Sequence, residues 1–386
     1  MKYIYNKRFA NTIILSVIIL CACNSTKHPQ KVIQQSPSNI LQIINTVNQY
    51  WQQNTPTNVR AFWDHATYHT ANIEVYKLTQ NNSYKQYSED WAKYNQWMGA
   101  TATNKDSWKY SYGEKPEFVL FGDWQTCFQV YIDLYRIDSA AVKVERAKEV
   151  INYQISTSKN DYWWWADGLY MVMPVMVKMY HLNGNKMYLD KLYEYYSYAN
   201  SIMYDSTEQI YYRDAKYIYP KHKTTTGKKD FWARGNGWVF AALAKVLQEL
   251  PKDDVHRNEY ISKFKGMAYS LKKYQQAEGY WTRSIADTAH APGYETSGTA
   301  FFTYAYLWGM NNGFLSKKEF EPIVSKSWDY LTKIALQPSG KIGYVQPIGE
   351  RAIPGQIVDK NATANFGVGA FLLAACEMYR FAEKKR

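Results

Sequence analysis

The sequence has little cysteine, proline and glycine for its length: 4, 12 and 20 of 386 residues. Four cysteines are too few for a disulfide-stapled scaffold of this size. The glycine and proline contents exclude a collagen-like repeat. The sequence also lacks a Walker loop, a Gly-x-Gly-x-x-Gly motif after a strand and a nucleophile elbow. The common motifs for nucleotide binding and serine hydrolysis are therefore missing.

Aromatic residues and positive charge are abundant instead. The chain holds 14 Trp, 36 Tyr and 15 Phe, which excludes intrinsic disorder because disordered chains are poor in aromatic residues. Its 46 Lys and Arg exceed its 34 Asp and Glu, so the formal net charge is +12. Such a charge favours a polyanionic partner. Composition alone leaves nucleic acid, acidic lipid and acidic polysaccharide open.

The first 23 residues have the pattern of an export signal. Basic residues precede the apolar run Thr12–Leu20, which is too short to span a bilayer and matches a signal-peptide core. The run ends in Leu20-Cys-Ala-Cys, which resembles a bacterial lipobox and makes Cys23 the acylated residue. Simple secretion with cleavage nearby is the alternative. Asn24 is not the Asp that retains lipoproteins at the inner membrane, so we expect the outer membrane or periplasm of a Gram-negative bacterium.

The remaining chain is expected to form one folded domain. We predict a lipoprotein signal peptide at 1–22, a polar tether at 23–38 and a catalytic domain at 39–386. Loss of the leader removes three positive charges and lowers the net charge to +9. Cys127 and Cys376 then remain, both in apolar helical surroundings, and buried inert thiols are the favoured interpretation. A disulfide between them stays open.

Apolar residues recur at helical spacing through nearly all of this domain. The first stripe, Ile40 to Val47, predicts a helix with Ser38 as its N-cap. Eleven more helices are predicted, at about 70–80, 84–98, 124–136, 140–155, 167–183, 186–204, 236–250, 256–276, 297–313, 318–336 and 363–382. Strand-like pieces occur only near Gln209–Tyr212 and Lys341–Gln346.

Polar or glycine-rich clusters precede alternate helices. They are centred on Asp64, Asp123, Asp167, Asn236, Ser297 and Asn365. Each step holds about two helices, which predicts an all-α fold: an (α/α)6 barrel of six helical hairpins. All six clusters would then lie at one mouth, where helix N-termini favour anions. A helical solenoid with a cap at every turn is the alternative, but the clusters hold many Trp and Gly for caps alone.

Asp167 is the strongest catalytic candidate. It follows Trp163-Trp-Trp-Ala, and a carboxyl group walled by indoles is desolvated. Desolvation raises its pKa and suits it to donating a proton near neutral pH. Asp123, from the preceding inner helix, would raise that pKa further by like-charge repulsion. The alternative is that Asp167 only caps a helix.

A second cluster contains Trp232, Arg234 and Trp238. An Arg between two indoles offers a planar fork for a carboxylate and flat walls for a sugar ring. The alternative is an Arg in a salt bridge at a helix start.

A basic loop lies upstream, with Lys216, Lys221, His222, Lys223, Lys228 and Lys229. It could attract carboxylate or sulfate groups, or be only a solvated loop. His65 and His69 are four residues apart, but the Glu of the zinc motif and a third ligand are missing. We therefore expect neither a metal nor a cofactor.

Four motifs together resemble one enzyme family. They are Trp165-Ala-Asp-Gly-Leu-Tyr-Met, Phe231-Trp-Ala-Arg-Gly-Asn-Gly-Trp, Glu295-Thr-Ser-Gly-Thr-Ala-Phe-Phe and Phe366-Gly-Val-Gly-Ala-Phe-Leu-Leu-Ala. In this order they resemble the unsaturated rhamnogalacturonyl hydrolases of glycoside hydrolase family 105, relatives of the unsaturated glucuronyl hydrolases of family 88. The resemblance covers about residues 40 to 381 and implies an (α/α)6 barrel.

The resemblance also implies a reaction. Substrates of the family carry a C4=C5 double bond in a terminal uronic acid, left by a polysaccharide lyase, and the enzyme hydrates that bond. Asp167 would protonate C4 and, as its conjugate base, help water add at C5. Asp123 would orient water or substrate. The resemblance implies that Trp165 and Trp238 would stack on the sugar and that Arg234 would meet the uronate. Trp232, Glu295 and Arg213 complete the predicted substrate-binding residues.

One segment departs from the family pattern. Where many relatives have a His after paired aromatics, this chain reads Tyr211-Tyr-Arg-Asp. With the basic loop and the net charge, Arg213 suggests a substrate more anionic than pectin fragments, such as a sulfated, rhamnose-containing glycan of the ulvan type. Rhamnogalacturonan fragments remain the alternative. A non-catalytic glycan-binding lipoprotein and an ordinary inverting glycosidase are the rival functions; nucleic-acid binding is disfavoured because the partner is absent outside the cell.

Overall fold

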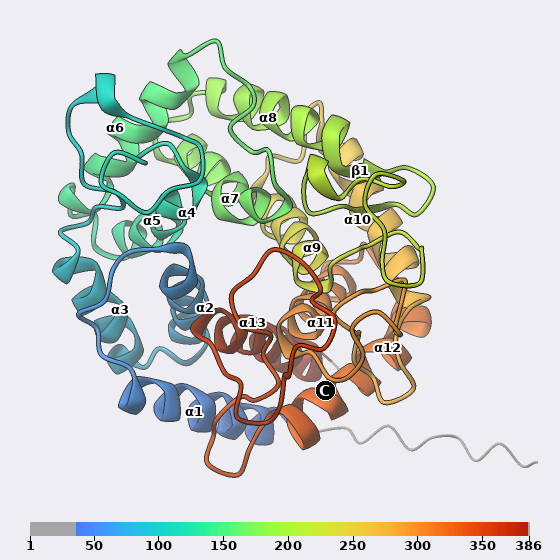
Figure 1. The fold of residues 1–386 in the computed structure, drawn as a ribbon. Coiled ribbons are helices and arrows are strands. Elements are labelled where there is room, and N and C mark those ends of the chain that lie inside the picture. Colours follow the sequence, from blue (N-terminus) through green and yellow to red (C-terminus); the bar gives the residue numbers. More distant parts are fainter. Residues whose placement is uncertain (1–35, 385–386) are drawn as a thin grey trace, which may run out of the picture. The chain divides into compact units, whose positions relative to one another are not determined.

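Two concentric rings of helices form the described part of the chain, residues 36–384 of a computed structural model (Figure 1). The inner helices are α2 (Trp63–Thr79), α4 (Gly122–Gln125) with α5 (Cys127–Asp138), α7 (Ala166–Asn183), α9 (Ala233–Glu249), α11 (Thr296–Asn311) and α13 (Asn365–Glu383). The outer helices are α1 (Pro37–Asn54), α3 (Asn82–Tyr94), α6 (Val142–Ser156), α8 (Met187–Met203), α10 (Arg257–Lys272) and α12 (Lys317–Tyr330). Short elements between them are η1 (Lys105–Ser107), η2 (Ala215–Tyr217), the π-helical turn η3 (Leu331–Ala335) and the paired strands β1 (Tyr204–Asp205) and β2 (Ile210–Tyr211).

The inner ring is closed. Along the chain, α7 packs on α9, α9 on α11 and α11 on α13, while α13 packs on α2. The ring continues from α2 to α5 and from α4 and α5 to α7. Each inner helix also packs against an outer helix. In Figure 1 the outer helices lie around the inner ring. The predicted (α/α)6 barrel is confirmed.

The two rings differ in how their side chains are patterned. In α7 every residue from Gly168 to Met179 is buried, because neighbours surround that helix. In the outer helix α10 the buried residues are Tyr260, Phe264, Met267, Ala268, Ser270 and Leu271, at helical spacing, and the other side faces water. Helices that are apolar all round occupy the interior of a protein, whereas a single apolar stripe marks a surface helix.

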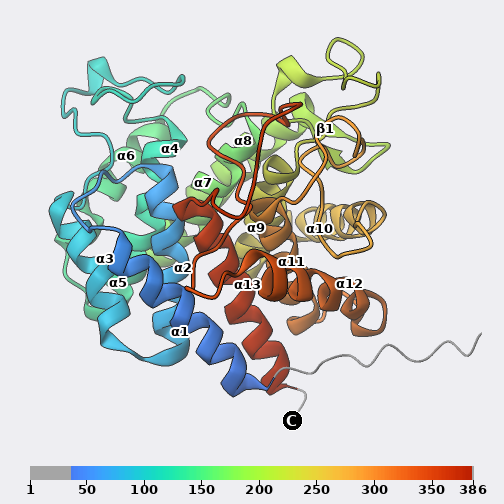
Figure 2. The same ribbon diagram turned by 60° about the horizontal axis from the view of Figure 1, so that its bottom comes forward.

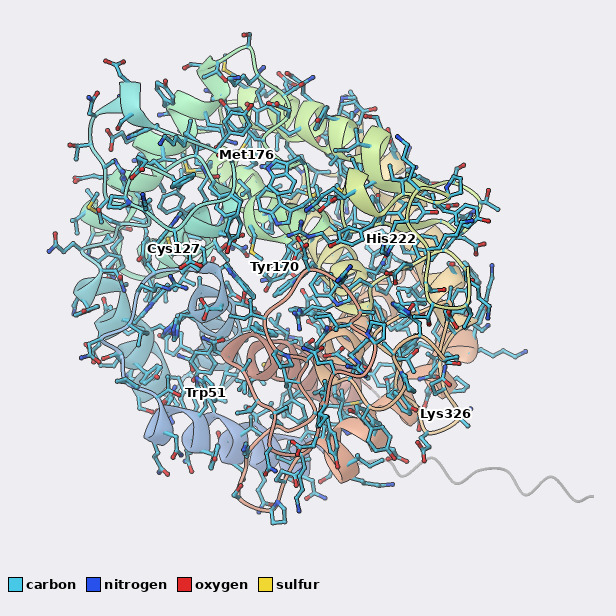
Figure 3. The ribbon with its side chains drawn as sticks, viewed as in Figure 1. Trp51, Cys127, Tyr170, Met176, His222 and Lys326 are labelled. Carbon is cyan, nitrogen blue, oxygen red and sulfur yellow. The ribbon has the colours of Figure 1, made fainter. Side chains whose placement is uncertain are left out.

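Aromatic side chains fill the middle of the barrel. Tyr170 of α7 lies near the centre of the ring in Figure 3. Its ring centroid is 4.8 Å from that of Trp238 and 5.5 Å from that of Phe301, and its hydroxyl lies 3.1 Å from Thr70 Oγ1. Because these side chains close the barrel axis, space for a ligand is left at the ends.

The six polar clusters lie where they were predicted, at the starts of the inner helices. Asp64, Asp123, Asp167 and Ser297 are each the second residue of their helix, Asn236 is the fourth and Asn365 the first. Long connections carry the chain over this end of the barrel, and Figure 2 shows them gathered on one side of the inner ring. The mouth predicted from the sequence is therefore formed.

Several details differ from the predicted helices and strands. Helix α1 begins at Pro37, within the predicted tether, and its N-cap is Ser36, whose side chain accepts from the Asn39 amide; Ser38 is inside the helix. Helix α2 begins seven residues before the predicted start at 70. The strand predicted at Lys341–Gln346 is wrong, since this segment forms only an isolated bridge between Leu336 and Ile342.

The predicted export signal, the Cys23 anchor and most of the tether lie outside the described residues. Within residues 36–384, no helix combines the length and apolar character needed to cross a bilayer. Cys127 and Cys376 are buried and unpaired, which answers the open disulfide question. Burial raises the pKa of both thiols, so they are inert, as expected.

Glycine allows two inner helices to touch. A Cβ added to Gly369 of α13 would lie 2.8 Å from the backbone oxygen of Thr67 in α2. Real Cβ atoms do not approach a backbone oxygen so closely, and neither helix backbone can move without opening the ring. This contact is where the last inner helix meets the first.

We predict that Gly369→Ala destabilises the protein by about 1–3 kcal/mol, the typical cost of overpacking. The urea midpoint measured by circular dichroism should fall. Gly349→Ala is the matched control, because its added Cβ would find no atom closer than 3.9 Å. Equal midpoints for the two variants would contradict close packing of α13 on α2.

Candidate active site

A cavity of about 450 Å³ opens at the mouth of the barrel. This volume is typical of small-molecule sites. Its lining comes from the starts of α2, α4 and α7 and from the loops above them: Arg60, Phe62, Trp63, Tyr112, Glu114, Phe121, Asp123, Trp164, Trp165, Asp167, Met171, Arg213, Lys216, Ile348, Gly349 and Glu350. The cavity thus combines aromatic walls with a small set of charged groups.

Asp123 and Asp167 both lie in this cavity, as predicted. Neither is an N-cap: α4 is preceded by Phe121 and α7 by Trp165, and neither start has a side-chain cap hydrogen bond. Helix capping therefore does not account for either carboxyl group. Asp167 Oδ2 is buried and has no hydrogen-bond partner.

The environment raises the pKa of both carboxyl groups. For Asp167, burial is the largest influence, and it outweighs the opposing charges of Arg213 and Arg234. For Asp123, burial raises the pKa well above its usual range, and the negative charge of Asp167 raises it further. Buried carboxyl groups next to each other cannot both ionise easily. The positive charge of Arg213, whose Nε lies 3.6 Å from Asp167 Oδ2, opposes the rise in pKa at both groups.

Trp165 and Trp164 form the aromatic wall next to Asp167. Trp165 is 2% exposed, and its ring stacks on that of Phe121 with centroids 4.8 Å apart. Trp164 is less buried, and the Arg213 guanidinium carbon lies 5.6 Å from its ring centroid. Trp163 points elsewhere and packs against Tyr195. Of the three consecutive indoles, two therefore line the cavity.

Arg213 lies at the cavity, as predicted, but its charge is already matched. Its Nη1 is 2.6 Å from Asp214 Oδ2 and 3.4 Å from Glu350 Oε2. Its Nε is 3.6 Å from Asp167 Oδ2 and has no hydrogen-bond partner. Lys216 reaches the same Glu350 oxygen at 3.5 Å. One wall of the cavity is therefore a network of cations and carboxylates.

The opposite rim was not predicted from the sequence. Arg60 and Glu114 form an ion pair in which each side chain is 45% exposed. Tyr112, from the same loop as Glu114, is 65% exposed, and its ring lies 5.7 Å from that of Phe121. An aromatic ring exposed at the edge of a cavity is a flat surface on which a sugar can stack.

Arg234 and Trp232 do not line the cavity. Arg234 is 1% exposed and donates to the backbone oxygens of Gln346, Pro347 and Gly349 at 2.7, 3.0 and 3.3 Å. Burial lowers its pKa to about 10. Trp232 is 2% exposed and donates from Nε1 to Gln346 Oε1 at 2.8 Å. Arg234 therefore has a structural role in this arrangement, which was the alternative to substrate binding. Its partners are backbone oxygens and not the carboxylate of the expected salt bridge.

Trp238 and Glu295 are also buried away from the cavity. Trp238 is fully buried and packs against Tyr170 and Phe301 at the barrel centre. Glu295 is fully buried and caps α11, accepting from the amides of Ser297 and Gly298 at 2.9 and 2.7 Å. The substrate contacts predicted for these two residues have no basis in this arrangement.

The basic loop is largely paired with acids. Lys229 Nζ lies 2.7 Å from Asp205, and Lys228 Nζ lies 3.8 Å from Asp287. His222, labelled in Figure 3, lies 2.8 Å from Asp230. The loop is therefore a folded part of the mouth, and much of its charge is matched within the protein.

His65 and His69 do not form a site together. His69 is buried, stacks on Trp91 with centroids 4.0 Å apart and lies 3.0 Å from Ser88 Oγ. Burial lowers the pKa of His65, against the opposing effect of Asp64. In the part of the chain that the structure describes, no three His, Cys, Asp or Glu side chains are grouped to hold a metal ion.

The residues missed by the sequence analysis share a cause. Arg60, Tyr112, Glu114 and Glu350 come from loops that have no helical period and no recognisable motif. Only their charge and aromatic character could have drawn attention, and such residues are common on surfaces. The cavity that results can transfer a proton to a ligand held against indole and phenol rings.

The chain matches the family model described as Glycosyl Hydrolase Family 88 over residues 39–382. An unsaturated 3S-rhamnoglycuronyl hydrolase of Formosa agariphila is 30% identical over 350 residues, which are 86% of this chain and 89% of the relative.

Two solved structures are each 60% identical to the chain and cover 90% of it. One is a glycosyl hydrolase family 88 protein from Bacteroides vulgatus, covered in full, with a TM-score of 0.89. The other is described as a polysaccharide lyase, is 98% covered and has a TM-score of 0.88. The resemblance found in the sequence motifs is confirmed at the level of the family.

We predict that Asp123→Asn stabilises the protein at pH 7 relative to wild type. The folded state holds the pKa of Asp123 above its unfolded value, so ionisation costs stability as the pH rises from about 4. Asparagine does not ionise, and the gain should be roughly 1–3 kcal/mol, the cost of an incompletely satisfied buried group. Urea midpoints at pH 7 and pH 4 check this.

The difference in urea midpoint between Asp123→Asn and wild type should shrink toward pH 4, where ionisation of Asp123 no longer costs stability. A gap of constant size at the two pH values would contradict the raised pKa. Asp329→Asn, at an exposed ion pair on α12, is the control for the change in net charge.

Proposed function

The chain belongs to glycosyl hydrolase family 88, and from this premise we propose that it removes a terminal 4,5-unsaturated uronic acid from oligosaccharides that a polysaccharide lyase has produced. The observation that carries the proposal is the pair of buried carboxyl groups in a cavity walled by aromatic rings. The name of the Formosa agariphila relative supports the same reaction class.

The reaction needs one proton donor and one water molecule. In the proposed step, Asp167 delivers its proton to C4 of the C4=C5 bond, and positive charge develops at C5 and the ring oxygen. Water adds its oxygen to C5 and returns a proton to the Asp167 carboxylate, so the enzyme is regenerated. The C5 hemiketal opens, C1 becomes an aldehyde and the neighbouring sugar leaves with its hydroxyl group. One water is consumed in total.

The cavity provides what this step requires. Burial raises the pKa of Asp167, which favours the protonated form that a general acid needs. Arg213, 3.6 Å away, stabilises the carboxylate that remains after proton transfer. Asp123, on the neighbouring inner helix, also has a raised pKa and can orient the water or a substrate hydroxyl. Trp164 and Tyr112 offer the sugar flat surfaces.

The sugar next to the uronic acid is the finer part of the proposal. The name of the Formosa agariphila relative contains a sulfated rhamnose unit, which supports rhamnose-linked substrates with sulfate, as in ulvan. Rhamnogalacturonan-type fragments without sulfate fit the same reaction. The charges of the cavity bear on this choice and are considered in the next subsection.

A lyase is the second candidate function, because one solved structure 60% identical to the chain is described as a polysaccharide lyase. A lyase creates the C4=C5 bond that the proposed hydrolase removes. Near-ultraviolet absorbance of the unsaturated uronate therefore rises for a lyase acting on an intact polysaccharide and falls for a hydrolase acting on lyase products. The two activities are separated by the sign of one signal.

We also propose that the protein is exported and anchored through Cys23. The lipobox-like Leu20-Cys-Ala-Cys supports this proposal. Labelling of cells with a fatty-acid probe, compared for wild type and Cys23→Ser, tests it.

We predict that Asp167→Asn loses at least about 100-fold in kcat on lyase-generated unsaturated disaccharides, because general acid catalysis typically contributes 10²–10⁴-fold. The fall in near-ultraviolet absorbance gives the rate. Binding of the disaccharide, measured by calorimetry, should remain, since asparagine is nearly the same size. If wild type and Asp167→Asn both left the absorbance unchanged, the enzyme proposal would fail in favour of a glycan-binding protein. Equal and measurable rates would show that Asp167 is not the general acid.

We predict that Arg213→Met shifts the alkaline limb of the pH profile of kcat/KM to higher pH. Removing the nearest cation raises the pKa of Asp167 further, and a general acid stays protonated up to its pKa. Arg213→Lys keeps a cation and should move the limb less. If the alkaline limb of the profile were unchanged in Arg213→Met, a group other than Asp167 would control that limb.

A further inference from the structure

The cations that line the cavity are all matched by carboxylates. On one rim, Arg60 pairs with Glu114. On the other wall, Arg213 and Lys216 share one oxygen of Glu350, at 3.4 and 3.5 Å. Arg213 also contacts Asp214 and Asp167, and Lys216 lies 3.8 Å from Asp214. The cavity therefore carries little net positive charge, although the chain as a whole is strongly basic.

Glu350 is held in its position by several contacts. Its Oε1 accepts from the Tyr217 hydroxyl at 2.7 Å. The start of its loop is fixed by Arg234, which donates to the backbone oxygens of Pro347 and Gly349. Partial burial raises the pKa of Glu350, but the Tyr217 hydrogen bond and the charges of Arg213 and Lys216 outweigh it and the pKa is lowered. Glu350 is thus a fixed negative charge at neutral pH.

A substrate of the proposed reaction brings one carboxylate of its own. Arg213 has an Nε–H group that is buried and without a partner, and this group faces Asp167 in the cavity. A second anion on the neighbouring sugar would enter a cavity that Glu350 and Glu114 also line, and every lining cation is already paired.

We propose that Glu350 is a specificity-determining residue that restricts the enzyme to unsaturated uronides whose neighbouring sugar is neutral. This inference rests on the proposed function and adds the substrate class. It selects the unsulfated alternative, in contrast to the sulfated unit in the name of the Formosa agariphila relative. Glu350 acts by repelling a sulfate or second carboxylate and by occupying the cations that would otherwise bind it.

The test compares two disaccharides that differ by one group: an unsaturated uronic acid linked to rhamnose, with and without a 3-sulfate. We expect wild type to prefer the unsulfated compound by roughly tenfold in kcat/KM, the effect of bringing a second negative charge close to a carboxylate that is about half exposed. Glu350→Gln should narrow the preference about tenfold, chiefly through a lower KM for the sulfated compound. The control Asp329→Asn makes the same change in net charge outside the cavity and should keep the wild-type preference.

A wild type that turns over the sulfated compound as well as the unsulfated one would overturn the inference. An equal effect of Glu350→Gln on both compounds would do so too, because it would show that Glu350 only supports the fold. Glu350→Asp keeps the charge and should retain the preference. If wild type consumed neither compound, the proposed function itself would fail, and the inference with it.

Discussion

Because the inner helices close into a ring, each of them is held between two neighbours. The position of the first residue of one inner helix therefore depends on how all the other inner helices pack. The contact of α13 with α2 completes the ring, and it brings Asn365 within 3.1 Å of Asp64, 301 residues earlier in the chain. Successive inner helices also pack side by side, and α4 lies next to α7, so that Asp123 and Asp167 open into one cavity. A solenoid with the same helices would keep that pair together but would separate Asp64 from Asn365. Ring closure thus adds the last side of the mouth.

The fold could be read from the sequence because both of its signals are local. Helical spacing of apolar residues gives the helices, and a polar cluster before every second helix gives their alternation between two rings. The same logic placed Asp123, Asp167 and Trp165 at the mouth, and comparison with the family motifs added Arg213. The structure brings all four to the cavity. Their catalytic and binding roles remain proposals, since geometry shows proximity and not turnover.

Side-chain direction could not be read in the same way. Trp238 and Trp165 both stand near the start of an inner helix, yet Trp238 points to the barrel axis, where it packs on Phe301. A shift of a few residues along the helix decides whether a side chain points to the cavity or to the barrel axis. The spacing of apolar residues in the sequence does not resolve such a shift. Glu350 was missed for another reason. Its place depends on hydrogen bonds from Arg234, more than a hundred residues away in the chain.

The motif around Arg234 therefore acts on the cavity indirectly. Arg234 holds the loop that carries Glu350, and Asn236 holds the backbone of Tyr211, accepting at 2.8 Å and donating at 2.9 Å. Tyr211 lies two residues before Arg213, so the motif fixes both members of the Arg213–Glu350 pair. Burial raises the pKa of Asp123 and of Asp167, and the positive charge of Arg213 opposes that rise at both. Glu350 pairs with the same guanidinium group. The net positive charge of the chain is balanced by carboxylates inside the cavity. In the proposal made above, the charges of the cavity, and not the net charge, therefore select the sugar next to the uronic acid.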